Sequence, residues 1–203
     1  MGSTSASEAN SVKHTGSGDY FDQAIETMPR EQLAHLQFER LRQTLRNAYD
    51  HVPLHRQRLD AVGVVPEEVR TLDDLRQVPF TYKADLRDQY PYGLLARPVS
   101  GLARIHASSG TTGKPTVVGY TQADIGHWSD LVARSLHAAG ARAGDLVHNA
   151  YGYGLFTGGL GAHYGIERLG AAAVPVSGGA TERQISLIMD LRPRVLCATP
   201  SYT

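Results

Sequence analysis

Seven consecutive residues, from Ser108 to Lys114, combine the residue types that a phosphate-binding loop needs. The sequence SSGTTGK supplies four hydroxyl groups, two glycines and one cation. Hydroxyl and backbone N–H groups donate hydrogen bonds to phosphate oxygens, glycine lets the backbone come close, and lysine supplies positive charge. We therefore predict a phosphate-binding loop made of Ser108, Ser109, Gly110, Thr111, Thr112, Gly113 and Lys114.

This loop differs from a Walker A loop, whose pattern is G-x-x-x-x-G-K-[ST]. Ser108 stands where the first glycine of that pattern belongs, and Pro115 replaces the hydroxyl residue that would hold magnesium. Pro115 also lacks an N–H group and disfavours a helical conformation at Lys114, where a Walker loop continues into a helix. The alternative that remains from the residues alone is a plain polar hairpin between Ile105 and Val117.

A second segment, YGYGLFTGGLGA from Tyr151 to Ala162, places aromatic residues and glycines directly after a predicted strand. Ligands of open α/β sheets bind beyond the carboxyl ends of the strands, and glycines leave room there for a flat ring. We predict that Tyr151 and Phe156 flank an aromatic ligand, and that Gly161 and Ala162 line its edge. The alternative is that Tyr151 and Phe156 are ordinary core aromatics at a strand-to-helix turn.

The histidines do not suggest a metal site. The sequence has nine of them, but they are scattered, and the nearest pair, His51 and His55, lies on either side of a proline. We expect surface or capping roles for this pair. His163 and Tyr164 lie one turn beyond the aromatic segment, where they either support that segment or pack in the core.

The elements that would position these residues divide the chain into three regions. Residues 1–19 are rich in Ser, Gly and Thr and have little to bury, so we expect a disordered tail. Residues 20–100 are expected to form a helical arm, and residues 101–203 part of an α/β domain. The longest helix of the arm is predicted from Arg30 to Tyr49, where apolar residues recur at helical spacing. Shorter helices are expected at residues 53–63, 73–77 and 83–89.

Beyond residue 101, short β-prone runs alternate with helical patterns. Strands are predicted at residues 104–107, 116–120, 146–150, 172–176 and 195–198. The last three recur at crossover spacing, which predicts a parallel sheet covered by helices. One helix is expected from Thr121 to Ala139, and Thr181 with Gln184 has the spacing of a capping box that opens another. The predicted fold class is therefore α/β.

Composition narrows the possible partners. Lys+Arg and Asp+Glu both number 20, so no overall field favours nucleic acid or an anionic membrane surface. No apolar run approaches the roughly 20 residues of a membrane-spanning helix, and no signal-peptide pattern is seen. Cys197 is the only cysteine, which excludes an intramolecular disulfide, and we expect it to be a small buried hydrophobe. We expect a cytoplasmic protein that acts on small molecules.

Several stretches resemble a known family. SSGTTGKP at residues 108–115 resembles the phosphate-binding signature of the adenylate-forming superfamily of acyl-CoA and aryl-acid ligases. VVGYT at 117–121, NAYGYGLFTGGLGAHYGIERLGAAAVPVSGG at 149–179 and YDHVPLHR at 49–56 resemble the phenylacetate–CoA ligase family. The resemblance extends from residue 20 to the end.

The resemblance implies a fold like the large N-terminal domain of adenylate-forming enzymes, and a two-step reaction. The carboxylate of phenylacetate attacks the α-phosphorus of ATP, and the thiol of coenzyme A then displaces AMP from the acyl-adenylate. Mg²⁺ would neutralise phosphate charge, and the residue 108–114 loop would hold the β and γ phosphates. A homodimer through the arm is a further expectation. The alternatives are a ligase for another aryl acid, or a non-catalytic nucleotide-binding remnant.

Other functional motifs of that family are missing from this sequence. Family members are longer, and the remainder carries the adenine- and magnesium-binding motif, the ribose-binding aspartate and a mobile catalytic lysine. We therefore expect the main catalytic groups beyond Thr203, and we expect the 203 residues alone to be inactive. The chain ends directly after a predicted strand, which indicates truncation, and apolar side chains at Val174, Val195 and Leu196 would then be exposed.

Overall fold

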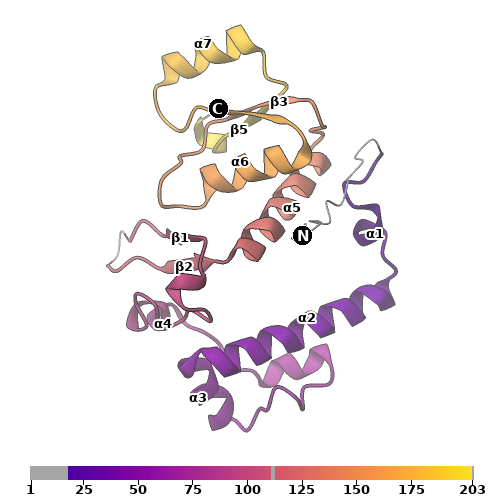
Figure 1. The fold of residues 1–203 in the computed structure, drawn as a ribbon, viewed down its shortest axis with the longest axis vertical. Helices are drawn as coiled ribbons and strands as arrows, with labels where there is room; N and C mark the ends of the chain where they lie inside the picture. The colour runs from indigo at the N-terminus through magenta and orange to yellow at the C-terminus, as the bar shows by residue number, and fades with distance from the viewer. Residues whose placement is uncertain (1–17, 111–112, 203) are drawn as a thin grey trace, which may run out of the picture.

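The computed structural model describes residues 18–110 and 113–202, which form a helical arm followed by an α/β region (Figure 1). Most of the predicted tail lies outside the described residues, and so do Thr111 and Thr112 of the predicted phosphate loop.

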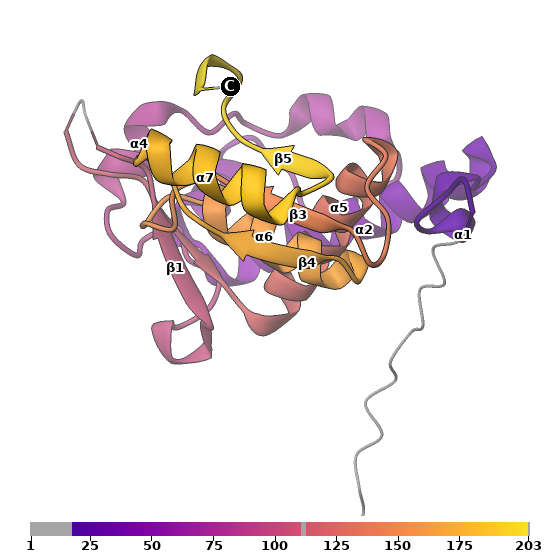
Figure 2. The same cartoon turned by 90° about the horizontal axis from the view of Figure 1, so that it is seen from above.

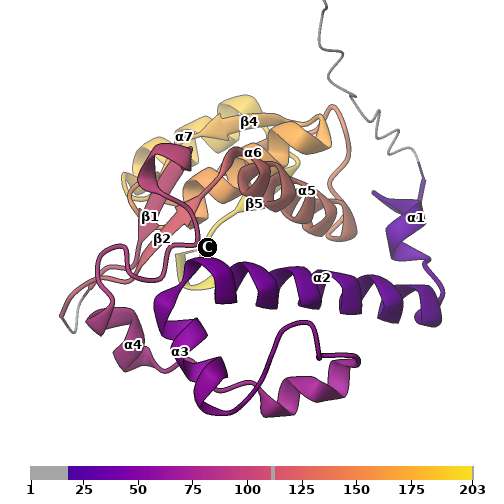
Figure 3. The same cartoon turned by 60° about the horizontal axis from the view of Figure 1, so that its bottom comes forward.

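The arm is built from short and long helices around a small core of its own. Its elements are α1 (Gln23–Glu26), α2 (Arg30–His51), α3 (Pro53–Ala61), η1 (Leu72–Gln77), α4 (Lys83–Asp88) and η2 (Val99–Gly101). Pro53 begins α3, which suits a residue without an N–H group to donate. Leu45, Leu59, Val64 and Val69 are buried together between these elements. Figure 3 shows α3 turning away from one end of α2, with both helices apart from the parallel sheet.

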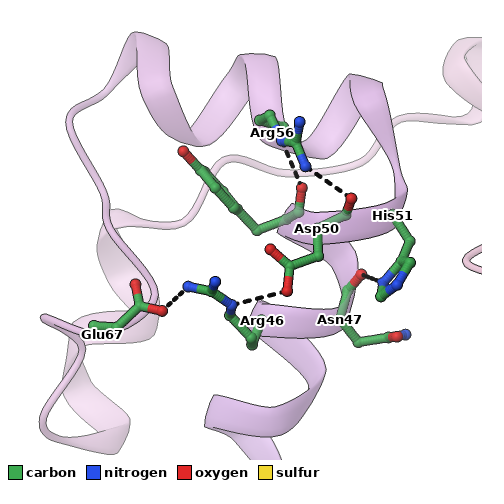
Figure 4. Close-up of polar contacts among 7 residues, drawn as sticks. Arg46, Asn47, Asp50, His51, Arg56 and Glu67 are labelled. Carbon is green, nitrogen blue, oxygen red and sulfur yellow. Dashed lines mark hydrogen bonds and ion pairs between the residues drawn. The ribbon is translucent and has the colours of Figure 1, made fainter.

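Polar contacts close the junction between α2 and α3 (Figure 4). Arg56 donates to the carbonyl oxygens of Tyr49 at 2.9 Å and Asp50 at 2.7 Å, so it satisfies acceptors at the end of α2. Arg46 pairs with the carboxylates of Asp50 and Glu67. Residues 49–56, which resemble the ligase family in sequence, therefore form the corner between α2 and α3.

A bidentate ion pair joins α3 to α4. Arg58 donates to both carboxylate oxygens of Asp85, at 2.7 and 2.6 Å. The backbone N–H of Tyr82 donates to the same carboxylate at 2.7 Å. These donors, Arg58 first, lower the pKa of Asp85 below its usual value.

The strands form two separate sheets. Strands β1 (Arg104–Ala107) and β2 (Val117–Tyr120) make an antiparallel hairpin in which Ala107 lies opposite Val117. Strands β3 (Leu146–Asn149), β4 (Ala172–Pro175) and β5 (Val195–Cys197) make a parallel sheet in the order β4-β3-β5. The prediction of a parallel sheet is confirmed, with β3 at its centre.

Helices cover both faces of the parallel sheet. Helix α6 (Gly158–Leu169) lies on one side, α7 (Thr181–Leu191) lies on the other, and α5 (Gln122–Ala138) packs beyond α6 (Figures 1 and 2). The core between α5, α6 and β3 includes Ala133, Ile166 and Val147, each fully buried. Phe21, which precedes α1, is buried in this same core. Segments at the start of the described chain therefore stabilise the α/β region.

Glycines allow α5 and α6 to approach closely. A Cβ atom at Gly161 would overlap the indole of Trp128, and one at Gly165 would overlap Val132. A larger residue at either position would force the helices apart. The structure thus gives Gly161 a packing role in addition to the predicted one at the edge of a ligand.

The predicted capping box at Thr181 and Gln184 is wrong. Helix α7 begins at Thr181 with Ala180 as the preceding N-cap residue. The Gln184 side chain instead contacts His148 Nε2 at 2.6 Å and donates to the carbonyl oxygens of Ser177 and Gly179. The side-chain amide of Gln184 is therefore occupied by these partners and does not bond back to the start of α7, as a capping box would need.

Candidate functional site

The predicted phosphate loop connects the two strands of the β1–β2 hairpin. The N–H of Ser108 donates to Thr116 O at 3.0 Å, and Ser108 Oγ accepts from the N–H of Thr116 at 2.9 Å. Gly110 and Gly113 have positive φ angles of 65° and 135°. A Cβ atom at Gly110 would lie 3.0 Å from the Gly113 carbonyl oxygen, so this turn requires glycine there. Strands β1 and β2 do form the hairpin of the alternative interpretation. A plain hairpin, however, does not explain why its loop carries a lysine.

Lys114 is exposed, and its ammonium group lies 5.5 Å from the centre of the Tyr90 ring. A cation over an aromatic face gains modest attraction while keeping its charge. Within the described ranges, no carboxylate forms an ion pair with Lys114. Among those residues no acid neutralises its charge, which leaves the ammonium group available to an anion. Whether Lys114 and the loop bind phosphate stays a prediction.

A cavity of about 490 Å³ lies between α5, α6 and the end of β5. Tyr151, Gly161 and Ala162, three of the predicted aryl-pocket residues, line it together with Trp128. The hydroxyl of Tyr151 donates to Ala198 O at 2.9 Å. Phe156 is not among the lining residues, and its side chain is 65% exposed. The structure brings three of the four predicted residues together and leaves Phe156 outside.

Asn149, which the sequence analysis missed, organises the aromatic segment from the end of β3. It is fully buried. Its amide donates to Tyr153 Oη at 2.8 Å and to Gly159 O at 2.9 Å, and it accepts from the N–H of Tyr151 at 3.3 Å. The position of Asn149 in the sequence could have predicted this role, because it lies between a buried strand and a glycine-rich turn. The amide of Asn can donate and accept hydrogen bonds at the same time.

A chain of hydrogen bonds continues from Asn149 to the surface of α6. Because Asn149 donates to Tyr153 Oη, the Tyr153 hydroxyl is free to donate to His163 Nδ1, 3.2 Å away. His163 Nε2 lies 3.2 Å from a carboxylate oxygen of Glu167. Burial raises the pKa of Tyr153, which keeps the phenol neutral. His163 therefore contacts the aromatic segment directly, which is the supporting role, the first of the two expected for it.

Cys197 lines the cavity but has no features of a nucleophile. It is half-buried, and burial raises the pKa of its thiol. A neutral thiol reacts slowly, because the thiolate is the nucleophilic form. Its expected role as a small hydrophobe agrees with this environment. Within residues 18–110 and 113–202, no group of three or more His, Cys, Asp or Glu side chains is arranged to hold a metal ion.

The chain has close relatives among known proteins, which match it over most of its length. No family model matches the chain. The chain is 56% identical over 191 residues to a phenylacetate–coenzyme A ligase of Aromatoleum evansii, which covers 94% of this chain and 43% of that protein. It is 60% identical over 178 residues to the phenylacetate–coenzyme A ligase of Thermus thermophilus, which covers 88% of this chain and 40% of that protein. The chain is homologous to part of the phenylacetate–CoA ligases.

The chain spans about two fifths of the length of the phenylacetate–CoA ligases that it matches. Among solved structures, a 2-hydroxyisobutyryl-CoA ligase in complex with 2-HIB-AMP and CoA superimposes with a TM-score of 0.86. That match has 33% sequence identity and covers 92% of this chain and 41% of the other. The α/β architecture is therefore that of the N-terminal domain of adenylate-forming ligases.

Proposed function

We propose that the protein containing this chain is an aryl-acid CoA ligase that activates phenylacetate. The observation that carries this proposal is the 56–60% identity to curated phenylacetate–CoA ligases over 88–94% of the chain. In the first step a carboxylate oxygen of phenylacetate attacks the α-phosphorus of ATP, and the bond to the leaving pyrophosphate breaks. In the second, the sulfur of coenzyme A attacks the acyl carbon and AMP leaves.

The chain's own residues would position these groups and stabilise charge. Lys114 and the loop N–H groups face the pyrophosphate, whose negative charge increases as the bond to it breaks. The cavity beside Tyr151 and Ala162 holds the phenyl ring through apolar contact. We expect ATP to be used together with Mg²⁺, which would neutralise phosphate charge as the pyrophosphate leaves.

Phenylacetate is favoured over a small aliphatic acid as the substrate. The relative bound to 2-HIB-AMP is 33% identical to this chain, whereas the phenylacetate–CoA ligases are 56–60% identical. The cavity volume of about 490 Å³ and its mostly apolar lining also suit a ring. A ligase for another aryl acid, or a nucleotide-binding remnant, remains the second candidate.

The test is ATP–pyrophosphate exchange by a full-length protein that contains these residues. Exchange should be fastest with phenylacetate, and slower by at least about tenfold with 2-hydroxyisobutyrate. Replacing Ala162 with Leu, which adds volume to the cavity, should reduce exchange with phenylacetate more than with the smaller acid. No exchange with any acid, in a folded protein that still binds ATP, would support the remnant instead.

The compartment and the assembly also belong to this proposal. None of the helices in the described part of the chain is long and apolar enough to cross a membrane. We place the enzyme in the cytoplasm, and we expect a homodimer through the helical arm. Size-exclusion chromatography with light scattering on the full-length protein tests the dimer.

A further inference from the structure

One backbone carbonyl connects the two predicted parts of the site. The oxygen of Leu155 accepts from the N–H of Ala107 at 3.0 Å and lies 2.9 Å from His106 Nδ1. Leu155 is in the middle of the aromatic segment, which has no helix or strand between residues 150 and 157. Ala107 is the last residue of β1 and directly precedes the phosphate loop. The Leu155 carbonyl therefore joins the aromatic segment directly to the end of β1, where the phosphate loop begins.

The imidazole of His106 is buried against two aromatic rings. It is 2% exposed and meets the rings of Tyr120 and Trp128 edge to face, with centroid distances of 5.5 and 5.7 Å. Trp128 in turn lines the cavity together with Tyr151. The His106 side chain thus contacts β2, α5 and the aromatic segment at once.

Packing alone does not account for a histidine at this position. Because a carbonyl oxygen only accepts, Nδ1 of His106 carries the hydrogen in its contact with Leu155. Nε2 is then an acceptor, and it has no partner among the described residues. Burying a polar atom without a partner costs free energy, and phenylalanine would fill the same space without that cost. The hydrogen bond to Leu155 is what histidine adds.

We propose that His106 is a positioning residue that fixes the aryl-acid segment relative to the phosphate loop. This inference rests on the proposed function. Adenylate formation needs the carboxylate in line with the α-phosphorus, and a misplacement of about 1 Å can reduce the rate about 100-fold. His106 touches neither substrate in this scheme. It acts through Leu155 and through the start of the loop at Ser108.

Two substitutions separate the hydrogen bond from the packing. His106→Phe keeps an aromatic ring but removes the donor, whereas His106→Asn places an amide N–H near the position of Nδ1. His137→Phe is the matched control, because His137 is also 2% exposed and lies 6.2 Å from an aromatic ring, that of Phe21. His137 lies near the C-terminal end of α5 and is not among the residues that line the cavity.

In the full-length enzyme, His106→Phe should lower kcat for ATP–pyrophosphate exchange by about 10- to 100-fold, with KM for ATP and for phenylacetate changed by less than about threefold. His106→Asn should recover most of the lost rate, and His137→Phe should stay close to the unsubstituted enzyme. An equal fall in both phenylalanine variants, or no recovery with asparagine, would overturn the positioning role.

Hydrogen exchange supplies a readout that does not depend on turnover. Peptides covering residues 151–157 and the end of β1 should exchange faster in His106→Phe than in His137→Phe, and asparagine should restore protection. Unchanged exchange in His106→Phe would overturn the inference even if the enzyme is active. Absence of activity in the unsubstituted protein would instead contradict the proposed function, and the exchange comparison would still decide the role of His106.

Discussion

At the scale of single residues, the groups that set the shape of the predicted phosphate loop are different from the lysine that carries its charge. Ser108 and Thr116 close the base of the loop, and Gly110 provides the positive φ angle that the turn needs. Lys114 lies over the face of Tyr90 and forms no ion pair with any residue that the structure describes. Substitutions of the residues that set the shape of the loop should therefore have different effects from substitution of Lys114.

Replacing Lys114 with Ala should weaken adenylation without weakening binding of the aryl acid. Loss of one charge-assisted contact costs about 1.5 to 3 kcal/mol, or roughly 10- to 150-fold in rate. Pyrophosphate exchange and calorimetric binding of phenylacetate in the full-length protein measure the two effects. Lys83→Ala, at an exposed position in α4, is the control and should change neither. Equal rates for the two variants would remove Lys114 from the phosphate site.

At the scale of elements, local patterns predicted the helices and strands but not the contacts between them. Alternation of β-prone and helical segments was sufficient for β3, β4, β5 and the covering helices, because each depends on periodicity within a few residues. The contact between His106 and Leu155 spans 49 positions, and that between His148 and Gln184 spans 36. No short-range spacing encodes such pairs. The unused capping box at α7 has the same explanation, because Gln184 contacts His148 instead. Asn149 is different, because its partners Tyr151, Tyr153 and Gly159 lie nearby in the sequence and its position at the end of a buried strand was a usable signal.

The close packing of α5 and α6 predicts opposite effects for two glycine substitutions. Gly165→Ala should lower the free energy of unfolding by about 1 to 3 kcal/mol, because its methyl group would overlap Val132. Gly126→Ala, in α5 with open space around it, should raise the free energy of unfolding by about 0.5 to 1 kcal/mol. Urea unfolding measures both. Equal effects would show that these helices separate easily.

The ion pair between α3 and α4 predicts a loss of stability in acid. Asp85 has a usual pKa of 3.8, and hydrogen bonds from Arg58 and Tyr82 lower it in the folded state. Stability from this pair is therefore complete above the unfolded-state pKa and is lost as the pH falls through the lower folded-state pKa. Asp85→Asn should destabilise the protein at neutral pH. It should also reduce the fall in melting temperature that is measured as the pH is lowered. Asp73→Asn should do neither, since that carboxylate is 84% exposed; an unchanged fall in Asp85→Asn would contradict the assignment.

At the scale of the whole molecule, the arm and the α/β region each have a core, and the buried Phe21 connects the start of the described chain to the second. Apolar side chains nevertheless remain exposed on one side of the sheet. Ile185 and Met189 of α7 are 57% and 69% exposed, and Leu196 of β5 is 45% exposed. Surfaces of this kind favour association with other apolar surfaces.

The 203 residues alone should not form phenylacetyl-adenylate. The chain spans about two fifths of its curated relatives, and in-line attack requires the whole nucleotide to be fixed. Trapping the acyl group with hydroxylamine, in the presence of phenylacetate, ATP and magnesium, measures this step. A full-length relative is the positive control. Turnover by the isolated chain at the rate of that control would show that this half of the site is sufficient.

The position of Trp128 has an optical consequence. It is the only tryptophan in the sequence, its indole stacks on Tyr120 with a centroid distance of 5.1 Å, and the same indole lines the cavity. Indole fluorescence depends on the polarity and mobility of the surroundings, and the imidazole of His106 lies against this ring. The emission of one residue in this chain therefore reports directly on whether the cavity is filled or hydrated, before any bond to phosphorus forms.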